Sequence, residues 1–435
     1  MYNAAFRLIS PLRVHCLLQP GVEFREERRT YDFWQAVAKK VGATLTRQSP
    51  DDDGLKYQST HSIDLGNDIT VLTCDTNPDV GKNFAVDAGI TVEKVRWSLC
   101  DFGILLVETS LKVAVDRRSA DEIETAVQRA ATAVNNSFIE DCYRELCDAI
   151  VGQNGYEDFV VFDNGPRIEH VWASRALIFD PDLIDYANEQ RIFAREWLAN
   201  TPESGQIVEK IERREESHSA DWMNYVYLKE DPSSATKSKE MWKALLRAQF
   251  YYAAMGRIDS KLMGILAWAM SQSPDISTSK LREQLRREMD FAEALFLKKS
   301  EIGKYVNPSS RLETERILGV WDFDDVLANP VQMKLNICQT RLDILESERA
   351  RSASFFTDLI LMVIGVTSIL GTALAVVSLG RSASADPDQT VYDLGAGDLT
   401  IWIATQPIDV ILLISTIVSV LMVAVFVVAR KRSEV

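Results

Sequence analysis

The sequence has few of the residues that build metal centres, and their spacing does not suit one. It contains four histidines and six cysteines in 435 residues, with no Cys-x-x-Cys pair and no zinc-type spacing. Cys142 and Cys147 are five positions apart on an expected helix, so they point to different sides of it. We interpret the cysteines as free, buried thiols, which suit a reducing cytosol. They are Cys16, Cys74, Cys100, Cys142, Cys147 and Cys338.

Recognisable catalytic motifs are also missing. No Walker A motif is present, because Gly81-Lys82 has Thr76 in place of the first glycine and Asn83 in place of Ser or Thr. There is no His-Glu-x-x-His, no Gly-x-Ser-x-Gly and no carboxylate pair with a known catalytic spacing. We therefore expect no enzyme, no catalytic residue and no cofactor. A bound divalent cation such as Mg²⁺ stays open, and its site is unknown.

Positive charge is in short supply. The chain has 48 Lys and Arg against 63 Asp and Glu, a net charge of −15. A nucleic-acid binder needs a basic face for the phosphates, so we expect no nucleic-acid partner. The hydrophobic share of 46% and the charged share of 26% are typical of a folded protein. The length suits about two or three domains.

Two long apolar runs stand near the end of this otherwise polar sequence. Residues 359–379 and 410–429 contain no charged side chain. At about 1.5 Å per residue, each helix would span a hydrocarbon core about 30 Å thick. Residues 1–7 lack the apolar run of a signal peptide, so we expect the preceding body in the cytoplasm. The lipid bilayer is thus a predicted partner.

The basic residues near these runs predict an orientation. Arginines precede the first run, Arg430-Lys431-Arg432 follow the second, and the connecting residues 380–409 hold only Arg381. The positive-inside rule therefore predicts a multi-pass protein of the inner (plasma) membrane, with both termini in the cytoplasm. The connection would be an acidic outer loop that could concentrate cations, although on charge alone ordinary solubility is the favoured explanation. Within residues 380–406 the loop carries Asp386, Asp388, Asp393 and Asp398, and Asp409 stands at the outer start of the second span.

The rest of the chain mixes strand and helix patterns. Ser119 and Glu122 form a capping box, and an apolar stripe behind it predicts one long helix up to Ile150. Strands are expected at 68–74, 95–115, 159–162, 173–179 and 222–228. Helices are expected at 182–200, 237–272, 279–305 and 309–318.

We therefore expect an α+β cytoplasmic domain, a helical region, a long stalk helix and a C-terminal hairpin of two transmembrane helices. Leu335, Cys338, Leu342 and Leu345 have the 3–4–3 spacing of a coiled-coil seam in the stalk, or of a face that packs within one chain. The expected boundaries are 1–231 for the α/β domain, 232–328 for the helical region, 329–358 for the stalk, 359–379 for the first span, 380–409 for the loop, 410–429 for the second span and 430–435 for the basic tail.

This order of parts resembles the CorA family of divalent-cation transporters. The resemblance is most specific from Val331 to Val435, and it implies a homo-oligomer, a pentamer, whose first spans line an ion path that the cytoplasmic domain gates. The family's Gly-Met-Asn signature is absent, because the corresponding region reads Val377-Ser378-Leu379-Gly380-Arg381-Ser382. Magnesium selectivity does not follow without it.

Two other resemblances leave the function open. The layout is similar to that of mitochondrial and fungal proteins of the sporulation RMD type, which implies a structural anchor. It also looks like that of CorA-like effectors in bacterial antiviral defence that lack the signature. That resemblance implies a membrane-anchored sensor whose cytoplasmic domain receives a small-molecule or protein signal.

Within the first span, small and hydroxyl residues recur with 3–4 spacing. The face contains Gly365, Ser368, Thr372 and Ala375, and the same spacing extended backwards reaches Asp358. Such a face either packs against another helix or lines a wet channel. Because a carboxylate facing lipid is costly, we predict an ion path that contains Asp358, Ser368 and Thr372.

Overall fold

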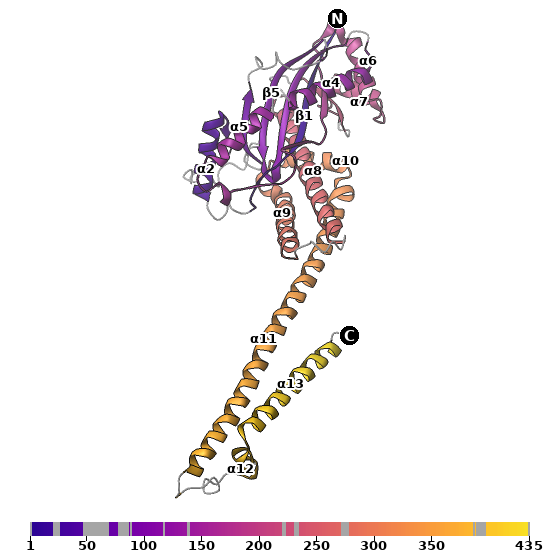
Figure 1. Cartoon of the computed structure of the whole chain (residues 1–435). Helices are drawn as coiled ribbons and strands as arrows, with labels where there is room; N and C mark the ends of the chain where they lie inside the picture. The colour runs from indigo at the N-terminus through magenta and orange to yellow at the C-terminus, as the bar shows by residue number, and fades with distance from the viewer. Residues whose placement is uncertain are drawn as a thin grey trace. The chain divides into compact units, whose positions relative to one another are not determined.

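The structure is a computed structural model, and it divides into two compact units, Met1–Leu342 and Asp343–Val435. The first unit holds an α/β sheet domain with further helices packed on the sheet, and the second is helical (Figure 1). The structure describes residues 2–20, 27–46, 69–76, 87, 89–115, 118–136, 140–219, 223–229, 235–270, 278–385, 388 and 397–433.

The sheet is built around β1 (Asn3–Val14), a strand that the sequence patterns did not predict. β1 pairs antiparallel with β6 (Ile104–Ala114) on one side and with β9 (Ser174–Phe179) on the other. β10 (Asn224–Leu228) runs parallel to β9 at one edge, and the order is β10-β9-β1-β6-β5-β4-β3. The remaining strands are β5 (Ile90–Cys100), β4 (Thr70–Thr76), β3 (Thr44–Leu45), β8 (Ile168–His170) beside β1, and a separate pair of β2 (Cys16–Leu18) with β7 (Val160–Phe162).

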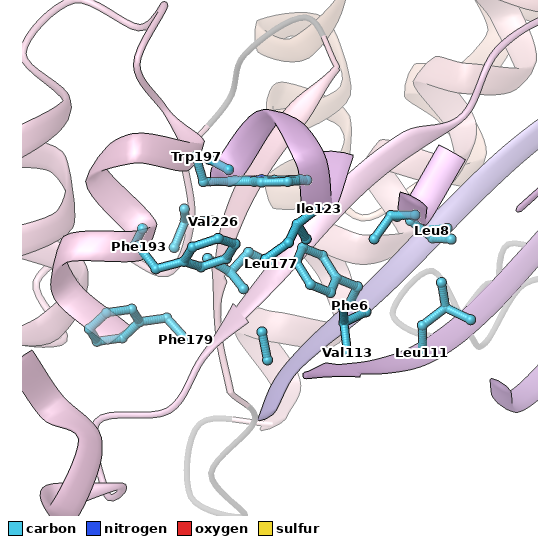
Figure 2. Packing of buried hydrophobic residues seen from close by; sticks show 14 of the residues in the cluster. Phe6, Leu8, Leu111, Val113, Ile123, Leu177, Phe179, Phe193, Trp197 and Val226 are labelled. Atoms are coloured by element: carbon cyan, nitrogen blue, oxygen red, sulfur yellow. The ribbon is translucent and has the colours of Figure 1, made fainter. Parts of the chain in front are cut away.

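One face of the sheet carries the main apolar core. Phe6 of β1 contacts Phe193 and Trp197 of α6, with ring centroids 6.4 and 5.0 Å apart (Figure 2). Ile123 of α4 lies in the same cluster. Fully burying such a side chain stabilises the fold by about 1.5–3 kcal/mol. The helices that supply this cluster are α4 (Ala120–Val134), α6 (Ala187–Trp197) and α7 (Ser204–Glu212). A second apolar cluster on the sheet is supplied by α2 (Glu27–Val41) and α5 (Glu140–Val151).

The opposite residues of β1 and β6 contact α8 (Ala235–Met270). Glu108 accepts hydrogen bonds from Arg7, at 3.0 Å, and from the indole nitrogen of Trp242, at 2.6 Å. The guanidinium of Arg7 also stacks over the Trp242 ring at 3.8 Å. α9 (Thr278–Tyr305) and α10 (Pro308–Val320) pack against α8, so the sheet lies between two helical layers.

The buried guanidinium group of Arg257 links α8 to the loops at the strand ends by hydrogen bonds and an ion pair. Arg257 donates to the carbonyl oxygens of Val14, at 2.7 Å, and Gly103, at 3.2 Å. Its other nitrogen pairs with Asp163 at 2.8 Å, and Lys261 reaches the same carboxylate at 2.6 Å. Because the side chain of Arg257 is 9% exposed, loss of its partners would leave an uncompensated buried charge.

Two of the predicted elements are divided in the structure. The expected strand 95–115 is the hairpin of β5 and β6, which turns at Asp101–Gly103 where Phe102 and Gly103 have φ of 58° and 65°. The capping box of Ser119 and Glu122 is confirmed, but its helix ends at Val134 and α5 begins at Glu140. Asn135, which caps the end of α4, keeps its backbone hydrogen bonds to Ala131 and Thr132, and its side-chain nitrogen lies 3.3 Å from a ring nitrogen of His170 of β8.

The other predicted strands and helices of the first unit agree with the structure to within a few residues. They correspond to β4, β7, β9, β10, α6, α8, α9 and α10. All six cysteines are free, three of them buried and three half-buried. The Gly81-Lys82 pair lies outside the described residues.

An ion pair between α10 and the chain before β10 makes the first unit sensitive to acid. Glu313 accepts from His218 and Arg316, both at 2.7 Å. Burial alone would raise the pKa of Glu313, but hydrogen bonds and charge from His218 and Arg316 outweigh it and lower that pKa to about 2. A carboxylate with a lowered pKa stabilises the fold above its unfolded pKa of 4.5, and this stabilisation is lost as the pH falls toward 2.

We expect Glu313→Gln to lower the free energy of unfolding by about 1–3 kcal/mol at pH 7. The variant should also lose less stability than the parent between pH 5 and 2, because the titrating group is gone. Urea denaturation at several pH values measures both effects. Glu315→Gln is the control, since Glu315 lies 60% exposed on the same helix. Equal pH dependence of the parent and Glu313→Gln would contradict the prediction.

Candidate functional site

The most distinctive element is α11 (Asn329–Ala385), a helix of 57 residues. Pro330 is its second residue, and a π-helical turn at Asp324–Ala328 leads directly into the helix. At about 1.5 Å per residue the helix is about 85 Å long. It begins in the first unit and continues without a break into the second.

One helix in the described part of the chain is long and apolar enough to cross a membrane. Thr357–Ser382 of α11 has a mean hydropathy of 2.5, and only 6% of its most apolar window is buried. A core helix of a soluble protein would be mostly buried, so this exposure favours a helix that needs an apolar surrounding other than its own chain.

The three residues of the predicted ion path share one face of this segment. At 100° per residue, Asp358, Ser368 and Thr372 fall within an arc of about 80° and along about 21 Å of the axis. Asp358 is half-buried, Ser368 and Thr372 are exposed, and Ser354 donates to the Asp358 carboxylate at 3.5 Å. The Thr372 hydroxyl donates to the Ser368 carbonyl at 2.9 Å, which leaves its oxygen able to accept or to coordinate.

The same 3–4 spacing continues toward the start of α11 as an exposed apolar stripe that the sequence reasoning missed. Met333, Ile337 and Ile344 are 60%, 38% and 43% exposed. Together with Thr340 and Ser347, these residues follow one another at intervals of four, three, four and three. The same intervals continue along the helix to Asp358, so all of them lie on the same face. Met333, Ile337 and Ile344 form a narrow exposed apolar face on an otherwise polar part of the helix. We refer to Met333, Ile337, Thr340, Ile344 and Ser347 as the stalk stripe.

The predicted coiled-coil seam has another role. Leu335 and Cys338 are 2% and 0% exposed and pack within the first unit, and Lys334 beside them pairs with Asp259 of α8 at 2.5 Å. The interpretation as a face that packs within one chain therefore holds for both. Leu342 is half-buried, and the side chain of Leu345 lies outside the described residues.

Of the four acidic residues predicted for the outer loop, the structure describes two. Asp388 is exposed, and Asp398 is exposed in the first turn of α12 (Asp398–Thr405). Asp386 and Asp393 lie outside the described residues. After α12 follows α13 (Ile408–Ser433), with an apolar part at Ile408–Leu421. In the described part of the chain, no group of three His, Cys, Asp or Glu side chains could hold a metal ion.

No family model, curated protein or solved structure matches the chain. Its function is therefore inferred from its own residues, and above all from α11. What α11 offers chemically is a row of oxygen atoms within an apolar segment. Carboxylate and hydroxyl oxygens are ligands for hard cations.

Proposed function

We propose that the chain is a CorA-like membrane protein whose copies associate around α11 and conduct cations along the face of Asp358, Ser368 and Thr372. The observation that supports this most is the continuity of α11. A single helix carries the exposed stalk stripe and, further along, oxygen-bearing residues on one face of an exposed apolar segment. Parallel copies in one bilayer would bring identical faces together in register.

The first step of the proposal is the topology. Residues 410–429 form the second span, the two spans form a hairpin, and the basic residues on either side keep both termini in the cytoplasm. Residues 380–409 then face outward.

We expect Ser384→Cys to react with a membrane-impermeant thiol reagent added outside intact cells. Ser433→Cys should react only after the membrane is permeabilised, because it follows the basic cluster at the other end of the hairpin. Both variants exchange one serine for cysteine, so accessibility alone separates them. Reaction of Ser384→Cys only after permeabilisation would contradict the orientation.

The second step is self-association through the stalk stripe, as a pentamer by the CorA resemblance. Each copy alone leaves Met333, Ile337 and Ile344 in water, and their burial between copies would add about 25 cal/mol per Å². Association also places the face of Asp358 toward the centre of the assembly, away from lipid.

We expect Ile337→Lys to shift the detergent-purified protein toward smaller assemblies, because it places a charge in each contact. Gln339→Lys adds the same charge at an exposed position off the stripe and should leave the assembly unchanged. Light scattering with correction for detergent measures both masses. A monomeric parent would contradict the association and, with it, the ion path.

The absent Gly-Met-Asn signature favours a second candidate, a membrane-anchored sensor or effector without ion conduction. The first unit, Met1–Leu342, would receive the signal in this case. Cation flux into liposomes separates the two, since an anchored sensor passes no ions while its assembly and topology stay as proposed.

A further inference from the structure

The first unit contains a cavity that the ion path does not use. It has a volume of about 670 Å³ and lies between the first turns of α9 and the ends of β2 and β7. Gln19, Pro20 and Val161 line the side of the strands. Phe291, 3% exposed, lines the side of α9 with polar residues of the same helix. A cavity of this size can hold a ligand as large as a nucleotide.

The α9 side of the cavity carries three guanidinium groups. Arg282 and Arg286 are one helical turn apart, and Arg287 follows them. Arg287 pairs with Glu288 at 3.0 Å, whereas no carboxylate in the described part of the chain lies within ion-pair distance of the half-buried Arg282. Guanidinium groups bind phosphate oxygens with paired hydrogen bonds, so this cavity offers an unused site for an anion.

Two carboxylates of the same helix also line the cavity, Glu283 and Asp290. They would repel a bare anion, but they accept hydrogen bonds from hydroxyl or amino groups. A ligand that carries both phosphate and hydroxyl groups satisfies the two kinds of side chain at once. The Gln19 side chain, whose nitrogen donates to the Glu157 carbonyl at 2.9 Å, keeps its oxygen as a further acceptor.

We propose that this cavity binds an organic phosphate with neighbouring hydroxyl groups, either a soluble nucleotide or the headgroup of a phosphorylated inositol lipid. Arg282 binds the phosphate, with Arg286 beside it, and Glu283 and Asp290 bind the hydroxyl side. The site does not depend on ion conduction by α11, because every lining residue belongs to the first unit. Under the proposed function it would be the place where the cytoplasmic domain receives a small-molecule signal.

The test is calorimetric titration of the full chain in detergent with ATP, with inositol trisphosphate and with inorganic phosphate. We expect one of the two organic phosphates to bind, and inorganic phosphate to bind at least about tenfold more weakly, because it cannot engage the carboxylates. Preference for ATP assigns the site to a nucleotide, and preference for inositol trisphosphate assigns it to a lipid headgroup.

Matched variants on α9 locate the binding. Arg282→Ala should weaken it about tenfold or more, and Arg282→Lys should weaken it less, since charge remains while the paired hydrogen bonds are lost. Lys280→Ala removes one positive charge from an exposed position on the same helix outside the cavity, and should have no effect. The proposal is wrong if neither organic phosphate binds at millimolar concentration, if inorganic phosphate binds as tightly, or if Lys280→Ala weakens binding as much as Arg282→Ala. If the protein conducts no ions but binds an organic phosphate as described, the ion-path proposal is wrong and the proposal for this cavity still holds.

Discussion

Asp358→Lys is expected to reduce cation flux through the reconstituted protein by about three-hundredfold, and Asp358→Asn by about twentyfold. A cation about 10 Å from one unit charge, at an effective dielectric of about 20, changes in energy by about 1.7 kcal/mol. Removing one carboxylate raises the energy of the cation at this position by that amount. Replacing the carboxylate with a positive charge raises it by twice that amount. Symmetric copies add further charges to the ring, so these values are lower bounds for an assembly.

The measurement is cation flux into liposomes that contain the parent or a variant in equal amounts. Asp409→Asn is the matched control, because Asp409 is exposed in the first turn of α13 and off the α11 face. It should conduct as the parent does. If both Asp358 variants conduct like the parent, Asp358 does not line the path, and the anchored sensor gains support.

Gly103→Ala is expected to destabilise the first unit by about 4–7 kcal/mol. Gly103 has a φ of 65°, which costs about 1–2 kcal/mol for a residue with a Cβ. A Cβ here would also stand 2.6 Å from a guanidinium nitrogen of Arg257 and 2.9 Å from the Val14 carbonyl oxygen. Since Arg257 is buried and bonded to Asp163, displacing it adds about 3–5 kcal/mol.

Gly42→Ala is the control that separates the backbone strain at positive φ from the displacement of Arg257. Gly42 has the same φ of 65° after the end of α2, but nothing lies within 4 Å of an added Cβ. We expect this control to lose only about 1–2 kcal/mol. Urea denaturation of the full chain, followed by tryptophan fluorescence, gives both values. Equal losses for the two variants would show that the contact with Arg257 does not hold α8 to the sheet.

Local patterns predicted much of the fold, and the failures came from contacts between distant residues. The capping box at Ser119 lies within four residues, so its sequence suffices. β1 escaped prediction because Pro11 stands in a central strand and Arg7 faces inward, both of which are unusual for such a strand. Arg7 is tolerated there because it pairs with Glu108 and stacks on the Trp242 ring. These two residues follow it by about 100 and 235 positions in the sequence.

The candidate site shows the same limit. Spacing along a helix placed Asp358, Ser368 and Thr372 on one face, and the structure agrees because α11 is regular there. The first part of α11 carries two stripes with 3–4 spacing, one through Leu335 and Cys338 and one through Met333 and Ile337. Which stripe is exposed depends on which face of α11 packs against the rest of the first unit. The spacing of residues along the helix does not tell one face from the other.

During biosynthesis, β1 is made long before the two strands that pair with it. β1 ends at Val14, but its neighbours β6 and β9 are complete only at Ala114 and Phe179. At about 5–20 residues per second, a ribosome makes those 165 residues in roughly 8–33 s. Until β6 is complete both edges of β1 lack a partner, and one edge still lacks its partner until β9 is complete, so β1 is open to wrong pairing throughout this interval. The apolar part of α11 is made later still, so the sheet can close before any segment reaches a membrane.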